Sequence, residues 1–177
     1  MDGLSERTIL GEGRYLRLVK EGRWEFVQRH WGPSAVAIVA VTAERRLVLV
    51  EQFRVPLGRR CIELPAGLVG DEGDASEEFA VAAKRELLEE TGYEAGQLSY
   101  LTIGPSSAGM ADEMVAFYRA SELVKIGPGG GDASESISVH EIPLDDVPHW
   151  LDEQAAAGAA IDFKIFAALY FIGQTTT

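Results

Sequence analysis

Residues 85–93 read RELLEETGY, and this stretch is the strongest indication of the fold. Glu86 and Glu90 are four residues apart, so a helix places them on one face, and Glu89 joins them at a spacing of three. Like charges on adjacent helical turns repel each other by roughly a few tenths of a kcal/mol per pair. A hard divalent cation removes this repulsion, because it binds carboxylate oxygens together with substrate phosphates. The residues alone leave two interpretations open, a metal-binding face and a solvated acidic face.

The residues before this stretch predict a helix over residues 76–91. Phe79, Ala83 and Leu87 recur at intervals of four, which is typical of a helix that buries one face. The charged residues then take the remaining faces. The residues suited to cap the helix are Ser76 or Asp74 at its start and Gly92 at its end.

Apolar and β-branched runs on both sides of the helix predict strands. The strongest runs, residues 35–41 and 47–50, are typical of central strands that are buried on both faces. Weaker patterns predict strands at 15–19, 24–27, 98–103, 114–118 and 137–142, and helices at 144–156 and 161–171. Because strands and helices do not alternate regularly, we expect an α+β domain around a mixed sheet.

The composition predicts one globular domain with an acidic surface. The chain has 177 residues and a formal net charge of −12. This balance argues against nucleic acid and anionic membranes as partners, because both require a basic surface. The N-terminus lacks the features of a signal peptide, no apolar run is long enough to span a bilayer, and the lone Cys61 fits a reducing compartment. We therefore expect a cytoplasmic protein.

The negative charge is concentrated around the predicted helix. Residues 71–94 hold nine acidic and two basic residues, so more than half of the net charge lies there. A phosphate-bearing ligand is compatible with this cluster only if a cation lies between the carboxylates and the phosphates.

The charged residues of this region have a defined spacing. Glu77 is followed by seven residues and then by the stretch 85–93. This order resembles the signature of the Nudix hydrolase superfamily, G-x5-E-x7-R-E-U-x-E-E-x-G-U, where U is an apolar residue. The second half matches at every fixed position. In the first half, Asp71 stands where the family has glycine, and the nearest candidate, Gly67, leaves nine residues before Glu77. We therefore expect residues 70–75 to bulge as a longer loop.

The resemblance implies a fold and a division of the chain. It implies a Nudix-type α/β/α sandwich around a mixed β-sheet in residues 34–177. Residues 1–33 would precede it as an N-terminal β segment.

Two segments resemble one branch of the superfamily. Residues 51–54 read EQFR and residues 63–67 read ELPAG, which is similar to Nudix hydrolases that act on ADP-ribose and other nucleoside diphosphate sugars. This resemblance implies that Arg54 touches the diphosphate, although a surface charge at a strand end is the alternative. The catalytic metal, Mg²⁺ or Mn²⁺, would be bound by Glu86, Glu90, Glu89 and the backbone carbonyl of Ala66. Arg85 precedes Glu89 by four residues and could orient the carboxylates, so we place Arg85 and Glu89 among the catalytic residues.

The base that activates water resembles, in this branch, a glutamate on a mobile loop before a late strand. Glu135 matches that position, because it precedes the predicted strand by two residues. Asp132 is the reserve candidate, and a solvated loop acid is the alternative for either residue. The glycines Gly129–Gly131 are expected to make the loop flexible.

A third segment, residues 106–113, corresponds to the stretch that is diagnostic of substrate in this branch. Ala108 stands where ADP-ribose enzymes usually carry proline, which leaves other nucleotide sugars open. Glu113 is expected to bind a metal or the terminal sugar, with a charge at a strand entry as the alternative.

Aromatic residues near the N-terminus could stack on the base of a nucleotide. Trp24, Phe26 and Trp31 are the candidates, because a base–aromatic stack contributes about 1–3 kcal/mol, although a place in the sheet core is the more common role for such residues. In related enzymes an N-terminal β segment packs on a second subunit and helps to form the base site. We therefore expect a homodimer.

The function that these residues favour is metal-dependent hydrolysis of the diphosphate bond of a nucleoside diphosphate sugar, with a nucleoside monophosphate and a sugar phosphate as products. One alternative is a pyrophosphohydrolase of dinucleoside polyphosphates or nucleoside triphosphates. The other is a non-catalytic Nudix-like module that senses a nucleotide.

Overall fold

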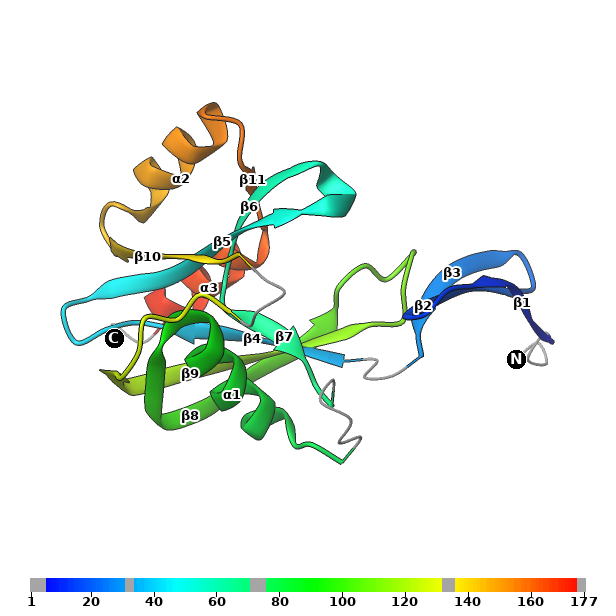
Figure 1. Cartoon of the computed structure of the whole chain (residues 1–177), viewed down its shortest axis with the longest axis horizontal. Helices are drawn as coiled ribbons and strands as arrows, with labels where there is room; N and C mark the ends of the chain where they lie inside the picture. The colour runs from blue at the N-terminus through cyan, green and yellow to red at the C-terminus, as the bar shows by residue number, and fades with distance from the viewer. Residues whose placement is uncertain (1–5, 31–33, 71–75, 132–135, 175–177) are drawn as a thin grey trace.

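The computed structural model describes residues 6–30, 34–70, 76–131 and 136–174 (Figure 1). The elements follow one another as β1 (Arg7–Glu12), β2 (Leu16–Glu21), β3 (Trp24–Arg29), β4 (Ser34–Ala40), β5 (Arg46–Arg54), the 3-10 helix η1 (Val55–Leu57), β6 (Arg59–Glu63), β7 (Ala66–Leu68), α1 (Phe79–Thr91), β8 (Tyr93–Pro105), β9 (Met114–Lys125), β10 (Ser138–Pro143), α2 (Val147–Ala156), β11 (Ala160–Ile161) and α3 (Lys164–Gly173). None of the helices in these ranges has the length and apolar character that crossing a membrane requires.

Strand β4 is central to the molecule. Its residues, SAVAIVA, are small or β-branched and suit a strand that is covered on both faces. It pairs parallel with β9 and antiparallel with β7, and β8 completes a sheet of order β7-β4-β9-β8. A second sheet has the order β10-β5-β6-β11 and also mixes parallel and antiparallel pairs.

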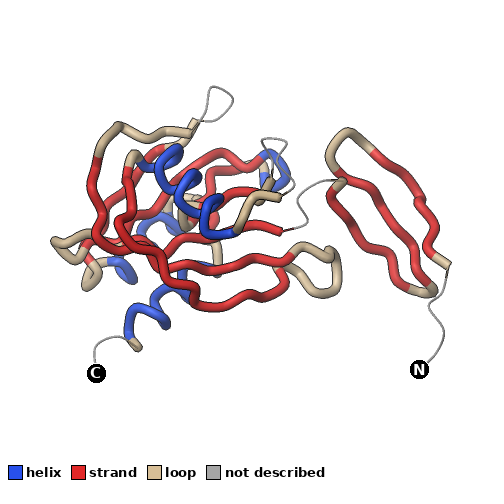
Figure 2. The backbone as a smooth tube through the Cα atoms, turned by 90° about the horizontal axis from the view of Figure 1, so that it is seen from below, coloured by secondary structure: helices blue, strands red, loops and turns tan. Residues whose placement is uncertain are grey.

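Successive side chains of β4 point to opposite faces and enter two different cores. Val36 and Ile38 belong to the core that contains Leu87 of α1. Val39 belongs to the core that contains Ile165 of α3. Figure 1 and Figure 2 accordingly show α1 on one side of β4 and α3 on the other. The expected α+β fold, with helices on both sides of a mixed sheet, is confirmed.

The first three strands form a separate sheet that extends away from the rest of the chain (Figure 1, Figure 2). The strands predicted at 15–19 and 24–27 are present as β2 and β3, which pair antiparallel, and β1 pairs with β2. This N-terminal sheet meets the segment before β9, where the Val27 N–H donates to the Met110 carbonyl at 2.8 Å and Val27 bridges Ala111. Every residue of β1 is exposed.

The start of α1 and four strands differ from the expectation. The helix begins at Phe79 rather than residue 76, and its N-cap is Glu78, whose side chain makes no capping hydrogen bond. Ser76 is therefore not the cap, and Asp74 lies outside the described residues. Strands β1, β6, β7 and β11 were not expected, because short strands with mixed polarity are defined by pairing with distant segments rather than by a local pattern.

Candidate active site

Two carboxylates of α1 are buried, although burial of an ionised carboxylate is costly without partners. Glu86 is 7% exposed and Glu90 is 3% exposed, whereas Glu89 lies on the exposed side of the helix. The four-residue spacing therefore aligns Glu86 and Glu90 on one inward face, as the sequence predicted, and separates Glu89 from them.

Strand β7 forms the wall that these two carboxylates face. The backbone N–H of Ala66 donates to Glu90 Oε2 at 3.0 Å. A Cβ atom at Gly67 would overlap the carboxylate of Glu86, so only glycine leaves room for that group. Gly67, with nine residues between it and Glu77, thus takes the place of the glycine that is absent at position 71. The ELPAG segment and the carboxylate helix form one unit.

Arg85 connects the acidic residues around the helix. Its Nε donates to Glu77 Oε1 at 3.0 Å, and its Nη1 donates to Glu86 Oε1 at 2.8 Å and to Glu89 Oε2 at 3.3 Å. Its Nη2 donates to the Leu68 carbonyl at 3.1 Å, which ties the helix to β7. Arg85 thus contacts the buried Glu86 and the exposed Glu89 at the same time.

Glu77 was not among the site residues chosen from the sequence. It pairs with Arg85, and its Oε2 accepts a hydrogen bond from the Gly70 N–H at 2.7 Å. Glu77 therefore closes the longer loop between β7 and α1. Glu77 precedes α1, which begins at Phe79, so its contact with Arg85 is made from the loop and not along the helix.

Arg54 lies near the same carboxylates and is held by a second residue that sequence reasoning missed. Its Nε and Nη2 donate to the two oxygens of Glu63, each at 2.6 Å. The hydrogen bonds that Arg54 donates to Glu63 raise the pKa of Arg54, and the charge of Glu90 adds to this effect. Glu63 is buried, whereas the side chain of Arg54 is 40% exposed, so the guanidinium is fixed from one side and open to a ligand from the other. Alternation along β6 could have indicated that Glu63 faces inward with Cys61.

Cys61 is 5% exposed and does not provide a nucleophile. Burial raises the pKa of its thiol to about 12, and the charge of Glu63 contributes. The thiol therefore stays protonated at neutral pH, and only the thiolate is strongly nucleophilic.

Glu113 is paired with the N-terminal sheet. Arg29 of β3 donates from Nε to Glu113 Oε2 at 2.7 Å, and next to this pair Gln28 donates a hydrogen bond to Asp112. The substrate-diagnostic segment and the N-terminal sheet therefore meet at the residue chosen from the sequence.

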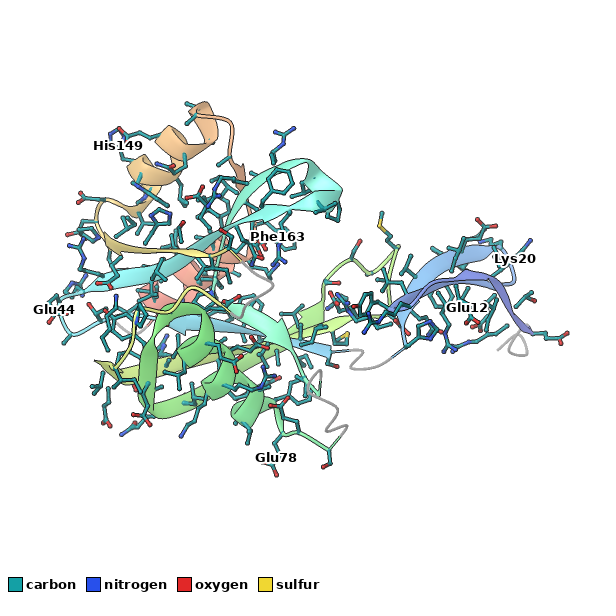
Figure 3. The ribbon with its side chains drawn as sticks, in the orientation of Figure 1. Glu12, Lys20, Glu44, Glu78, His149 and Phe163 are labelled. Atoms are coloured by element: carbon teal, nitrogen blue, oxygen red, sulfur yellow. The ribbon has the colours of Figure 1, made fainter. Side chains whose placement is uncertain are left out.

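The structure does not bring Trp24 to α1 within one chain. Trp24 pairs with Glu21 beside the β2–β3 turn and is 56% exposed. Figure 3 labels the neighbouring Lys20 at the far end of the N-terminal sheet. Two other predicted site residues, Trp31 and Glu135, lie outside the described residues, as does the reserve candidate Asp132.

The donor set fits a hard divalent cation. Glu86 and Glu90 present carboxylate oxygens on one buried face of α1. The absence of a side chain at Gly67 leaves the space that the carboxylate of Glu86 occupies. Within the described ranges, no group of three or more acidic, histidine or cysteine side chains is gathered closely enough to bind a metal by itself. Binding would therefore also draw on a backbone oxygen and on substrate phosphates, which is usual for Mg²⁺.

A family model described as the NUDIX domain matches residues 32–168. The chain belongs to the NUDIX family. This membership confirms the resemblance inferred from residues 85–93 and extends it from β4 to the first half of α3.

Three known proteins place this NUDIX chain among its relatives. The ADP-ribose pyrophosphatase of Bacillus subtilis (strain 168) is 42% identical over 179 residues, and the match covers 93% of each chain. The methanol dehydrogenase activator of Bacillus methanolicus is 39% identical over 129 residues, which are 72% of this chain and 66% of that protein. A crystal structure of an ADP compounds hydrolase has a TM-score of 0.75 and 18% identity, and the match covers 98% of this chain and 96% of that chain, which shows the same fold.

Proposed function

We propose that this NUDIX chain hydrolyses the diphosphate bond of a nucleoside diphosphate sugar, ADP-ribose or a close relative. The observation that carries the proposal is the pair of buried carboxylates, Glu86 and Glu90, against Ala66 and Gly67. Such a pair suits a metal-assisted hydrolase, and the chain is 42% identical over 93% of its length to an ADP-ribose pyrophosphatase. The products would be a nucleoside monophosphate and a sugar phosphate.

A divalent cation, Mg²⁺ or Mn²⁺, is the proposed cofactor. The groups that would hold it are the carboxylates of Glu86, Glu89 and Glu90 and the backbone carbonyl of Ala66. When bound, such a cation neutralises phosphate charge and lowers the pKa of a water molecule. Arg85 would keep the carboxylates of Glu86 and Glu89 in position through the contacts described above.

Arg54 would bind the diphosphate. Its bidentate pair with Glu63 fixes the guanidinium plane, so the donors that remain are already oriented for an anion. Glu135 would accept one proton from the attacking water. The water oxygen forms a bond to one phosphorus atom, the bridging oxygen leaves with the other phosphate, and the two products separate.

The N-terminal segment, residues 1–33, would act as a unit distinct from the hydrolase domain, residues 34–177. We propose that it packs on a second copy of the chain in a homodimer. Its exposed apolar side chains support this proposal, since several on β1 and β2, among them Ile9, Leu16 and Leu18, are at least 39% exposed. In such a dimer Trp24 and Trp31 could stack on the nucleobase, and Glu113 could contact the terminal sugar or a metal. A cytoplasmic location would keep the lone Cys61 thiol reduced.

A substrate panel tests the proposed reaction. The purified chain is incubated with ADP-ribose, other nucleoside diphosphate sugars and dinucleoside polyphosphates, each with Mg²⁺, Mn²⁺ or EDTA. A phosphatase that attacks only terminal phosphates then releases inorganic phosphate from the products. We expect release from at least one nucleotide sugar with either metal and none with EDTA. Release from no nucleotide sugar would overturn the proposal, and preferential release from a dinucleoside polyphosphate would favour the alternative.

A further inference from the structure

The C-terminal end of α1 is closed by a distant glycine-rich segment. The last four carbonyls of a helix have no partner within the helix. Here the Leu88 carbonyl accepts the Gly92 N–H at 2.8 Å, as in an ordinary glycine cap. The carbonyls of Glu89 and Glu90 accept the N–H groups of Gly131 at 3.1 Å and Gly130 at 2.8 Å. The N–H groups that donate to the carbonyls of Glu89 and Glu90, on the last turn of α1, therefore come from the connection between β9 and β10.

This contact requires glycine at one position above all. A Cβ atom at Gly129 would lie 2.5 Å from the Thr91 carbonyl carbon and 2.6 Å from the Glu90 oxygen, and both are backbone atoms that cannot turn aside. Gly129 also has a φ of 70°, and Gly130 and Gly131 have φ values of 113° and 78°, in the region that glycine favours. These glycines, which were expected to make the loop flexible, also allow the backbone of residues 129–131 to pack against the helix end.

Glu90 is consequently held from two directions. Its carboxylate accepts the Ala66 N–H of β7 at 3.0 Å, and its backbone carbonyl accepts the Gly130 N–H. Glu89 has the same double restraint, since Arg85 contacts its carboxylate at 3.3 Å and Gly131 contacts its carbonyl. The two glutamates on the last turn of α1 are fixed by their main chain as well as by their side chains.

We infer that Gly129–Gly131, the glycine latch, is a positioning segment for the metal-binding glutamates. The latch sets the last turn of α1 against β7, so that Glu89 and Glu90 keep the separation from Glu86 that a shared cation requires. This inference rests on the proposed function of the same glutamates. It adds that a segment about forty residues further along the chain controls how tightly they bind the metal.

A pair of glycine variants in the same connection tests the latch. Gly129→Ala places a methyl group against the backbone of α1, whereas Gly127→Ala is the matched control. A Cβ at Gly127 would meet only the Gly92 Cα at 4.0 Å, and Gly127 has no positive φ. We expect Gly129→Ala to raise the Mn²⁺ concentration for half-maximal binding by about 10-fold, because groups that orient metal ligands typically contribute that much. At saturating metal, kcat should fall while the KM of the nucleotide sugar changes little, because Arg54 is not displaced.

Direct binding of Mn²⁺, followed by electron paramagnetic resonance, separates this inference from the proposed function. If the wild-type chain binds Mn²⁺ and Gly129→Ala weakens binding, the latch stands even when no nucleotide sugar is hydrolysed. If nucleotide sugars are hydrolysed but Gly129→Ala and Gly127→Ala bind Mn²⁺ equally, the latch is overturned and the proposed function stands. Absence of Mn²⁺ binding by the wild-type chain would overturn the latch as well.

Hydrogen exchange in the wild-type chain covers the case in which Gly129→Ala does not fold. The amides of Gly130 and Gly131 should exchange as slowly as those of the last turn of α1, because they donate to its carbonyls. Exchange at the rate of an open loop would show that the latch does not form in solution.

Discussion

The helix α1 and the N-terminal sheet differ in which side chains they bury and which they expose. Around α1, charged residues are buried, and Glu86 and Glu90 face β7 with defined partners on several sides. In the N-terminal sheet, apolar residues such as Ile9 and Leu18 are exposed, and the contacts with the rest of the chain lie at residues 110–113. The buried charge supports the ligand site proposed at α1, and the exposed apolar surface supports the partner proposed for the N-terminal sheet. The proposed ligand site can be tested on a single chain, whereas the proposed partner surface can be tested only through the association of two chains.

Substitution of a buried carboxylate should have the largest effect. Glu86→Gln keeps the shape of the side chain and removes its negative charge, so hydrolysis should fall by about 1,000-fold or more, since loss of a metal ligand removes transition-state stabilisation of this order. The thermal midpoint should change little, because the glutamine retains an acceptor oxygen for Arg85, which also pairs with Glu77. Glu78→Gln is the matched control, because Glu78 is exposed at the start of the same helix (Figure 3). Full activity of Glu86→Gln would show that the buried pair does not bind the catalytic metal.

Substitution of Gly67, which leaves space for the carboxylate of Glu86, should have the second-largest effect on activity. Gly67→Ala would push the flexible end of Glu86 aside, so the fold should survive while kcat falls by about 100-fold, as expected when a catalytic group is misplaced. Gly104→Ala is the control, because a Cβ there meets nothing within 4 Å. Steady-state kinetics and thermal melts of the two variants would decide. Equal loss of melting temperature and activity in both would contradict this role.

A substitution on the exposed face of the N-terminal sheet should weaken dimerisation and not directly change the hydrolysis reaction. Leu18 is 39% exposed, so Leu18→Lys should not disturb the fold of one chain but should weaken a dimer through that face by about 10-fold or more. Sedimentation equilibrium over a range of concentrations measures this change. Val81→Lys, on the exposed side of α1, is the control because Val81 is 54% exposed in another region. If wild type and Leu18→Lys are both monomers, the sheet does not serve the proposed dimer.

Removal of the exposed ion pair between Lys125 and Glu141 should have the smallest effect. Its cost in free energy of unfolding is a reference value with which the effects in the two regions can be compared. The hydrogen bond from Lys125 lowers the pKa of Glu141, and burial opposes this shift. A lowered pKa in the folded state stabilises the protein above the pKa of the unfolded carboxylate, and this stabilisation is lost as the pH falls through the folded value. Lys125→Met should therefore cost about 0.5 kcal/mol or less at pH 7 and nothing once Glu141 is protonated in strong acid. Denaturant unfolding at both pH values tests this, and an equal cost at both would contradict it.

Local patterns were sufficient for the elements with strong periodicity. The apolar period of four located α1, and the β-branched runs located β4 and β5, because their side chains are buried on the faces that those patterns define. The partner of Arg54 could not be predicted in the same way. Glu63 is nine residues away on another strand, and only the pairing of β5 with β6 directs both side chains to one face.

The sequence by itself determined the family, the helix with its three glutamates and the glycine that ends it. These features depend on spacing within a few turns, where a helix converts sequence distance directly into direction. Only the tertiary structure decided that Gly67 makes room for Glu86, that Arg85 holds Glu77 and that Gly129–Gly131 close the end of α1. Each of these contacts joins the helix to a loop or another element, and the closeness of two backbones is set by packing rather than by local preference. Among the acidic residues of 71–94 that the structure describes, Glu77, Glu86 and Glu89 pair with Arg85, and Glu90 accepts a hydrogen bond from the Ala66 N–H.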